Sequence, residues 1–468
     1  MSNEFFPKVS RIEFKGPEST DPLSFRHYDP DFVIMGKPMK EWLRFSVCWW
    51  HTFVGGGGRD PFGAETLQRP WEDDILDPME LAKRRVDVAF EFFAKLGVEY
   101  YTFHDFDVAP EADSLEESMK NVDIITDYLL EKQKETGIKL LWATQNLFSH
   151  RRYMNGAMTN PDVHVFCYAA AQIQKVCDVV HKLGGENQVF WGGREGYQSL
   201  LNTDVKKECD HMAAMFKMAV DYKKRKGYKS QFLLEPKPRE PSRHQYDYDA
   251  QSVMGFLHEY GLEKDFKLNI EPNHTTLAGH TPEHDVTIAS AYGMLGSVDS
   301  NSGDMEVGWD TDCFPMDLRE TTAIMSVIVK QGGLAPGGLN FDVSRTLSWL
   351  FNFRILAHII FGTFAFTLPQ AKVRRESVEP EDLFLGHVAA MDCYALGLRK
   401  AVAMQQTMQA MLDERYISWS TEPLAQKIEK GEATIEECAE HAKRMGPPIQ
   451  KSGKQELYEA TRNRFLYG

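Results

Sequence analysis

Short apolar runs alternate with longer amphipathic stretches along most of the chain. Eight runs rich in β-branched, aromatic and aliphatic residues predict strands at 44–50, 98–105, 139–144, 188–193, 231–237, 267–272, 294–300 and 337–342. Between them, apolar residues recur at helical spacing, for example over 115–135, 161–184, 205–225, 248–260, 282–292 and 318–331. Strands that alternate with helices pair in parallel, and eight of them can close a (β/α)8 TIM barrel.

An open, doubly wound sheet is the alternative fold for the same pattern. It is disfavoured because no G-x-G-x-x-G opens a helix after the first strand, and neither GGGG (55–58) nor GGREGY (192–197) has phosphate-binding spacing. We therefore predict an N-terminal extension (1–43), a barrel domain (44–394) and a helical, charged tail (395–468) that packs on its own barrel or on a neighbouring subunit.

Charge and cysteine content narrow the class of protein. Asp and Glu (68) outnumber Lys and Arg (53), and the formal net charge of −15 argues against nucleic acid or an anionic membrane as the main partner. The seven cysteines are scattered without a C-x-x-C pair, which is typical of a reduced intracellular protein. The first twenty residues lack an apolar segment, so we expect no signal peptide and a cytoplasmic location.

The predicted strands end in an unusual number of acidic side chains. The residues at or just after the strand ends are His104, Asp107, Glu235, Lys237, Glu271, His274, Asp299 and Asp342, and the loop after the seventh strand holds Asp310 and Asp312. An isolated Asp at such a position is more often a helix N-cap than a ligand. Their joint occurrence at the catalytic end of a barrel instead indicates cations, because carboxylates this dense repel one another. Oxygen ligands with a single imidazole suit Mg²⁺ or Mn²⁺, with Co²⁺ tolerated, and the ligand count suggests two ions that share one carboxylate.

Seven segments resemble the motifs of the xylose isomerases, in the longer class with an N-terminal extension. They are TFHDFD (102–107), WGGREGY (191–197), LLEPKPREPSRHQYD (233–247), NIEPNHTTLAGH (269–280), GSVDSNSGD (296–304), GWDTDCFP (308–315) and GGLNFD (337–342). The likeness runs from about residue 5 to the C-terminus.

The resemblance implies a role for each candidate residue. Glu235, Glu271, Asp299 and Asp342 would hold a structural cation, and Glu271, His274, Asp310 and Asp312 a catalytic one, with Glu271 as the bridge. His104, oriented by Asp107, would assist opening of the sugar ring, and Lys237 would polarise the C1 carbonyl oxygen. Trp49, Trp191 and Phe62 would form apolar walls, with the Phe reaching in from a neighbouring subunit.

The implied activity is the metal-dependent conversion of D-xylose to D-xylulose, and of D-glucose to D-fructose, by a hydride shift from C2 to C1 in a homotetramer. A metal-dependent phosphoesterase or nuclease is the nearest rival, but such enzymes carry more His ligands and a basic face. The other rival is an isomerase-like protein that has lost activity.

One segment departs from the family pattern directly after Asp342. The family continues there with a sequence like AKVRRES, which in this chain begins only at Ala371. The 28 intervening residues, 343–370, contain sixteen apolar side chains and two charged ones, Arg345 and Arg354. An apolar segment beside a sugar site would expose a large apolar patch that favours aggregation, and it could impair the enzyme.

We interpret this insert as a translated intron. Its first residue is Val, whose codons begin with GT, and its last is Gln, which CAG encodes; 28 codons also preserve the frame. A functional lid and a membrane hairpin are the alternatives, and Arg354 and His358 argue against the hairpin. Finding these codons in the main mature transcript would exclude the intron.

Overall fold

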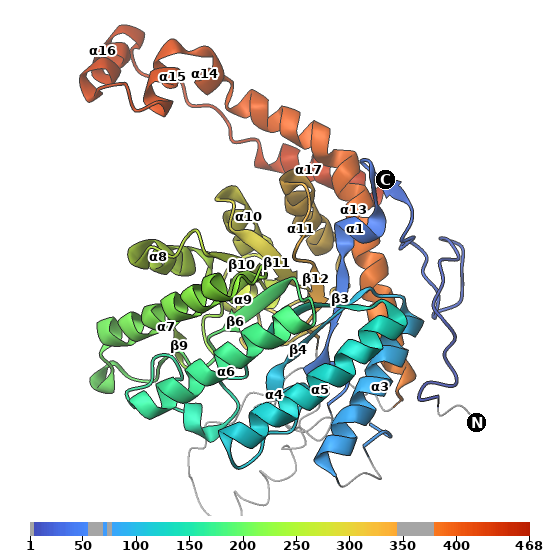
Figure 1. The fold of residues 1–468 in the computed structure, drawn as a ribbon. Helices are drawn as coiled ribbons and strands as arrows, with labels where there is room; N and C mark the ends of the chain where they lie inside the picture. The colour runs from blue at the N-terminus through green and yellow to red at the C-terminus, as the bar shows by residue number, and fades with distance from the viewer. Residues whose placement is uncertain (1–3, 55–68, 73–76, 344–378) are drawn as a thin grey trace, which may run out of the picture.

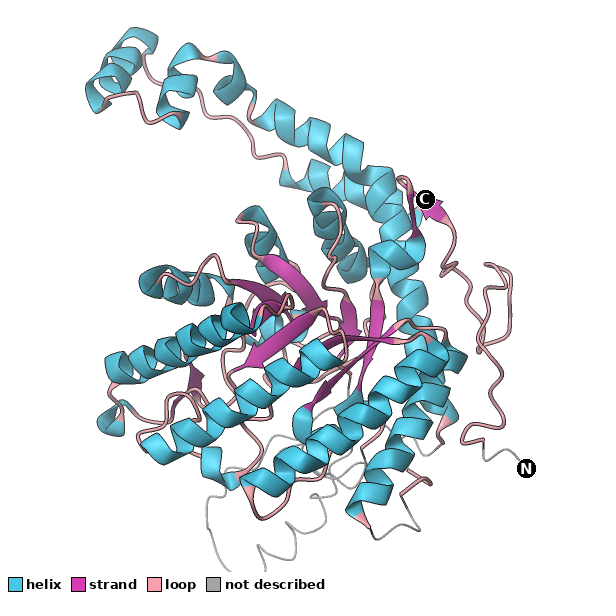
Figure 2. Cartoon of the chain, in the orientation of Figure 1, coloured by secondary structure: helices cyan, strands magenta, loops and turns pink. Residues whose placement is uncertain are grey.

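The centre of the molecule is a closed barrel of eight parallel strands (Figures 1 and 2). The computed structural model describes residues 4–54, 69–72, 77–343 and 379–468. Around the barrel the strand order is β3-β4-β5-β6-β8-β10-β11-β12, so consecutive strands of the chain are neighbours and the last pairs with the first. The predicted TIM barrel is therefore confirmed. Its strands are β3 (Phe45–Cys48), β4 (Tyr100–His104), β5 (Lys139–Thr144), β6 (Asn187–Trp191), β8 (Gln231–Glu235), β10 (Phe266–Ile270), β11 (Leu295–Asp299) and β12 (Leu339–Phe341).

Helices surround the barrel, as Figure 2 shows. The crossover helices are α3 (Pro78–Leu96), α5 (Leu115–Thr136), α6 (Val163–Lys182), α7 (Val205–Lys226), α8 (Ala250–Tyr260), α10 (His284–Ala291) and α11 (Leu318–Gln331), and α13 (Glu381–Arg415) packs beside α11. Short elements fill the connections: β1 (Val33–Ile34), β2 (Lys37–Pro38), α1 (Met39–Leu43), α2 (Trp49–Thr52), α4 (Asp105–Val108), η1 (Arg151–Tyr153), β7 (Gly196–Tyr197), η2 (Leu200–Asn202), β9 (His244–Gln245) and α9 (Pro272–Leu277).

Local sequence signals fix where the long helices begin and end. In α3 the Asp77 side chain accepts hydrogen bonds from the backbone N–H groups of Met79 and Glu80, and Pro78 occupies the first turn, where no N–H is needed. The helix ends at Gly97, whose φ of 82° lies in the left-handed region that glycine adopts without strain. Helix α11 has the same pairing, with Asp317 as the N-cap and Gly332 after its last turn, and it spans the predicted residues 318–331.

Apart from 139–144, the predicted strands end one or two residues beyond the strands of the structure, and at the first strand this difference affects the site. We predicted this strand over 44–50, but β3 stops at Cys48 and Trp49 begins the single-turn helix α2. A strand places alternate side chains on opposite faces, whereas a helical turn rotates each residue by about 100°. The orientations of Trp49 and Trp50 therefore follow the helix and not the strand.

The two ends of the chain pack differently against the barrel. Near the N-terminus, Phe6 inserts between the rings of Trp71, Phe92 and Phe384. Helix α13 runs without interruption across residues 394 and 395, the boundary that we predicted between barrel and tail. Beyond it, α14 (Ile417–Thr421), α15 (Pro423–Glu429) and α16 (Ile435–Met445) project away from the barrel, and α17 (Gln455–Tyr467) returns along α13 (Figure 1).

No helix in the described ranges has the length and apolar character needed to cross a bilayer. Val343, two residues after the end of β12, is buried, but the remaining residues of the insert, 344–370, lie outside the described part of the chain. The intron, lid and membrane-hairpin hypotheses therefore stay predictions.

Gly337 is expected to be intolerant of a side chain. A Cβ at this position would lie 1.9 Å from the carbonyl oxygen of Gly296, and a backbone atom cannot move aside cheaply. We expect Gly337→Ala to lower the free energy of unfolding by about 3 kcal/mol or more. Gly255→Ala is the matched control, since its Cβ would meet nothing within 4 Å inside helix α8; it should stabilise by about 0.5–1 kcal/mol. Thermal unfolding of both variants measures this, and a Gly337→Ala protein as stable as wild type would contradict the close approach.

Candidate active site

Acidic side chains converge at one end of the barrel because its strands are parallel. Glu235 and Asp299 are the last residues of β8 and β11, while Glu271 and Asp342 follow β10 and β12 directly. His274 lies on α9, which begins immediately after Glu271, and Asp310 and Asp312 lie in the connection between β11 and α11. The structure thus brings all seven predicted metal ligands to one mouth of the barrel.

These ligands form overlapping groups that share Glu271. One donor atom of each member lies within 4.8 Å of the others in three such sets, which are Glu235–Glu271–His274, Glu271–Asp310–Asp312 and Glu271–Asp299–Asp342. Glu271 is the residue common to all three sets. A carboxylate in that position can reach two neighbouring cations at once, which is the arrangement that we predicted for a bridging ligand.

Burial makes this concentration of acid energetically unfavourable on its own. Burial raises the pKa of Glu235, Glu271 and Asp299 well above the usual range of carboxyl groups, and the neighbouring carboxylates raise it further. Glu271 experiences Asp310, Asp342 and Asp312 in addition to its own desolvation. The cluster is therefore stabilised by protonation or by bound cations.

The imidazole of His274 has the tautomer and orientation that a metal ligand needs. Its Nδ1 lies 3.1 Å from the carbonyl oxygen of Pro236 and donates to it, which leaves the lone pair on Nε2. That Nε2 lies 3.2 Å from Oε2 of Glu271 and 3.5 Å from Oδ2 of Asp310. Burial, followed by the charge of Lys237, lowers the pKa of His274 to about 4, so the ring is neutral at pH 7.

This donor set fits a pair of divalent cations. The neutral Nε2 of His274 and the facing carboxylate oxygens are all electron-pair donors, and a cation between them satisfies each without protonation. One nitrogen among many carboxylate oxygens is the ligand chemistry of Mg²⁺ or Mn²⁺, since zinc sites favour more nitrogen and sulfur.

Four asparagines that the sequence analysis did not single out orient the acids. Asn269 donates from Nδ2 to both Glu235 and Asp299, at 2.9 Å each, and Asn340 donates to Oδ1 of Asp299 at 2.9 Å. Asn301 donates to Oε1 of Glu271 at 2.7 Å, and Asn273 donates to Asp310. Each lies inside a motif that carries a predicted ligand, so their proximity in sequence was the available signal.

The predicted proton-transfer groups sit beside the acids. Nδ1 of His104 lies 2.6 Å from Oδ2 of Asp107, which holds the proton on Nδ1 and leaves Nε2 as the reactive atom. Both side chains are buried, at the end of β4 and in α4. Lys237 is likewise buried, and its Nζ donates to Oδ2 of Asp310 at 2.6 Å.

Aromatic rings join these groups into one site. Trp50 packs on His104 with ring centroids 4.2 Å apart, and its Nε1 donates to Oδ1 of Asp342 at 3.0 Å. Phe148 contacts the rings of both His104 and Trp191, and Lys237 lies 5.1 Å from the centroid of Trp191.

Trp49, which we predicted as a wall of the site, lies elsewhere. Its fully buried ring packs on Phe53, Phe93 and Tyr101, between the barrel and its helices. Trp50 faces the acids instead, because both residues belong to the helical turn α2. Phe62, the other predicted wall, lies outside the described residues.

His51 is a further residue at the acids that the sequence analysis passed over. Its Nε2 lies 3.3 Å from both Oδ2 of Asp312 and Oδ1 of Asp342, so one imidazole contacts a predicted ligand of each cation. Its position next to Trp50 in α2 is the only signal in the sequence that could have pointed to it.

The stability contribution of Glu320, which contacts the connection that carries Asp310 and Asp312, is expected to depend on pH. Its Oε2 accepts a hydrogen bond from Ser302 at 2.6 Å, and burial raises its pKa from 4.5 to about 7. The charged form of Glu320 therefore opposes folding. Its cost in free energy of unfolding grows as the pH rises from 4.5 to 7 and stays constant at higher pH. We expect Glu320→Gln to gain about 1–2 kcal/mol of stability at pH 8 and less at pH 5.5. Thermal unfolding at both pH values tests this against Glu131→Gln on the exposed face of α5, and a gain independent of pH would contradict it.

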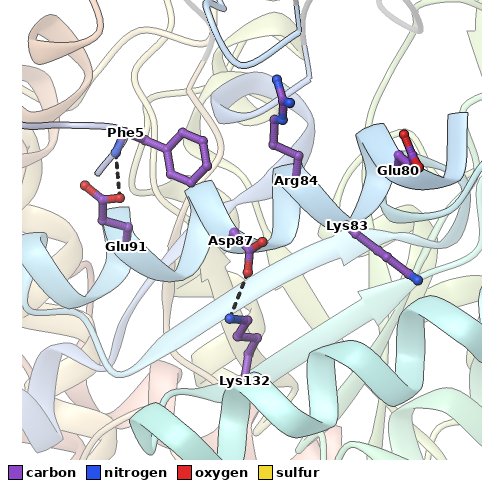
Figure 3. A pocket seen from close by; sticks show the side chains of 7 residues that line it. All are labelled: Phe5, Glu80, Lys83, Arg84, Asp87, Glu91 and Lys132. Carbon is purple, nitrogen blue, oxygen red and sulfur yellow. Dashed lines mark hydrogen bonds and ion pairs between the residues drawn. The ribbon is translucent and has the colours of Figure 1, made fainter. Parts of the chain in front are cut away.

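A second hollow lies on the outer surface of the barrel helices (Figure 3). It encloses about 590 Å³ and is lined by Phe5, Glu80, Lys83, Arg84, Asp87, Glu91 and Lys132. Its central charges pair with each other, since Nζ of Lys132 lies 2.8 Å from Oδ1 of Asp87, as Figure 3 shows. None of the predicted site residues lines this hollow, so the barrel mouth remains the candidate active site.

Known proteins resemble the chain over its whole length. A xylose isomerase of Bacteroides thetaiotaomicron is 48% identical over 466 residues, which cover 99% of each chain. One from Arabidopsis thaliana is 48% identical over 458 residues, 97% of this chain and 90% of its own. The model of the XylA2 C-terminal domain matches residues 412–466. Among solved structures, a D-allulose 3-epimerase from Methylomonas sp. covers 74% of this chain and 96% of its own, with 12% identity and a TM-score of 0.47. On the identity shared over nearly the full length with these curated relatives, the chain belongs to the xylose isomerase family.

Proposed function

We propose that this protein catalyses the reversible isomerisation of D-xylose to D-xylulose, and of D-glucose to D-fructose. The observation that carries the proposal is the buried group of acids that share Glu271, next to the His104–Asp107 pair and the Lys237 ammonium. An aldose and its ketose differ in the position of one hydrogen, on C2 or on C1. The reaction therefore needs a means to open the sugar ring, charge stabilisation at O1 and O2, and a site without free water.

Two divalent cations, Mg²⁺ or alternatively Mn²⁺ or Co²⁺, are the cofactors that we propose. Glu235, Glu271, Asp299 and Asp342 would hold one, and Glu271, His274, Asp310 and Asp312 would hold the other. When bound, such ions supply Lewis-acid stabilisation of negative charge on the hydroxyl and carbonyl oxygens of the sugar.

His104 is the group suited to ring opening. Asp107 fixes the proton on Nδ1, so Nε2 can accept a proton from the anomeric hydroxyl and return it to the ring oxygen. Lys237 can donate a hydrogen bond to the carbonyl oxygen that opening creates at C1, which makes that carbon more electrophilic.

The aromatic side chains favour a direct hydrogen shift. Trp50, Phe148 and Trp191 present ring faces beside His104 and Lys237, and such surfaces exclude water from the space between them. The hydrogen on C2 then moves to C1 with its electron pair, while the O2 proton leaves and the O1 oxygen gains one. The family resemblance adds Phe62 of a neighbouring subunit to this wall.

Isomerisation of D-xylose in D₂O tests the reaction and its course together. We expect Mg²⁺-dependent formation of xylulose with no deuterium at C1, and both proton and carbon NMR can detect this. Deuterium at C1 would indicate proton transfer through solvent, and no turnover by any form of the chain would contradict the proposed activity. The chain of 468 residues is assayed beside one lacking 343–370, because activity confined to the shorter form would support the intron hypothesis.

We also propose a cytoplasmic homotetramer in which the tail (395–468) contacts neighbouring subunits. The projecting segment exposes large apolar side chains, such as Trp419, Ile435 and Ile449, which contact with another subunit would cover. The free thiols of all seven cysteines fit a reducing compartment. Light scattering should give four times the chain mass, and a monomer at micromolar concentration would contradict the assembly.

A further inference from the structure

We propose that His280, His284 and Asp285, together with Asp249, form a second kind of metal site, selective for Zn²⁺ and similar late transition metals. None of the four belongs to the proposed catalytic machinery. They come from three segments: Asp249 is the N-cap of α8, His280 lies in the connection after α9, and His284 and Asp285 open α10.

The first support is the geometry of the donor atoms. One ligand atom from each of His280, His284 and Asp285 lies within 4.8 Å of the other two. Nε2 of His280 is 3.4 Å from Oδ2 of Asp249, close to the separation of about 3.3 Å between two ligands of a tetrahedral zinc ion with bonds near 2.05 Å. Oδ1 of Asp249 caps α8 through the backbone N–H of Ser252, at 2.7 Å, whereas Oδ2 is the oxygen that pairs with Nε2 of His280.

The second support is a buried carboxylate oxygen. Asp285 is 2% exposed, and its Oδ1 has no hydrogen bond of good geometry, although the backbone N–H of Ala250 interacts with the carboxylate. Its Oδ2 accepts a long hydrogen bond from Thr275 at 3.5 Å. A buried carboxylate with only weak hydrogen bonds is incompletely compensated, and a cation would remove the remaining cost. Burial raises the pKa of the Asp285 carboxyl, and the negative charge of Asp249 raises it further. A bound cation would offset both effects.

The two imidazoles are free to adjust to an ion. Their rings stack with centroids 4.1 Å apart and an interplanar angle of 14°, an arrangement that disfavours two positive charges. Both side chains are partly exposed, so one ring can turn out of the stack until both nitrogens point at a common centre. Two imidazoles with one or two carboxylates are ligands for Zn²⁺, Co²⁺ or Ni²⁺ rather than for Mg²⁺.

Metal counting in the presence of Mg²⁺ tests the site. The full chain is saturated with Mg²⁺ and dialysed against micromolar Zn²⁺, and bound zinc per chain is measured by mass spectrometry. Because zinc also enters the catalytic sites, the decisive quantity is a difference between variants. We expect His284→Ala and Asp285→Asn each to bind one zinc fewer than wild type, and His258→Ala, an exposed histidine of α8, to bind the same number.

Equal zinc content in wild type and both site variants would overturn the proposal. Anomalous diffraction at the zinc edge from wild-type crystals decides the matter if a variant fails to fold. A peak between His280, His284 and Asp285 is expected, and peaks at the barrel mouth alone would exclude the site. Neither measurement depends on sugar turnover, so the result stands apart from the proposed activity.

Discussion

Replacing Glu271 with glutamine is expected to lower xylose turnover by about 10³-fold, because an amide cannot bridge two cations. Glu271 belongs to three of the four ligand groups at the barrel mouth, the fourth being His51–Asp312–Asp342. Glutamine has the same shape and can still accept the hydrogen bond from Asn301, so the local packing is kept. The loss should therefore come from the chemistry of the site and not from misfolding.

The same substitution should stabilise the metal-free protein at pH 8. Burial and the neighbouring acids raise the pKa of Glu271, so the charged form opposes folding above the ordinary carboxyl range, and glutamine removes that charge. Thermal unfolding in EDTA and in Mg²⁺ measures this: the variant should unfold later than wild type in EDTA and gain less from Mg²⁺. Glu259→Gln, at an exposed position of α8, is the control. Full activity, or an undiminished gain from Mg²⁺, would contradict the bridging role.

Replacing Lys237 with methionine is expected to lower turnover by about 10²–10³-fold and to destabilise the protein most strongly without metal. The ammonium lies 2.6 Å from Oδ2 of Asp310, and both side chains are buried. Removing one partner of a buried ion pair typically costs about 3–5 kcal/mol, since the other charge is left uncompensated. Cations bound by Asp310 would compensate part of that charge, so the stability loss should shrink in Mg²⁺.

Steady-state kinetics and thermal unfolding with and without Mg²⁺ measure both effects. Lys226→Met, on the exposed end of α7, removes a lysine at the surface and should change neither quantity appreciably. An equal loss of stability in EDTA and in Mg²⁺ would show that Lys237 acts through packing alone. Normal turnover would exclude it from the proposed polarisation of the C1 carbonyl oxygen.

Strand ends could be predicted from sequence to within two residues, which was accurate enough to locate the site. Lys139–Thr144 and Leu318–Gln331 have the predicted bounds, and eight predicted strands form the barrel. Once the strands are known to be parallel, residues at their carboxyl ends must meet at one mouth. Glu235, Glu271 and Asp299 could therefore be grouped without any knowledge of contacts.

Side-chain direction could not be predicted where the chain changes from strand to helix. Trp49 and Trp50 are adjacent and chemically identical, so their different surroundings depend on the helical turn that begins at Trp49. The roles of Phe148 and His51 were equally hidden, since each reaches the site from a connection whose path depends on packing with distant segments.

By itself the sequence determined the barrel, the family motifs and the identity of the acidic ligands. The spacing of apolar residues defines each strand and helix locally, and the parallel pairing of the strands then brings the residues at their carboxyl ends together. Only the tertiary structure decided that Glu271 lies within reach of three ligand groups, that Trp50 rather than Trp49 faces His104, and that Asp249 of α8 meets His280. These are contacts between segments distant in sequence, and their geometry is set by how helices and strands pack in three dimensions, which no local pattern encodes.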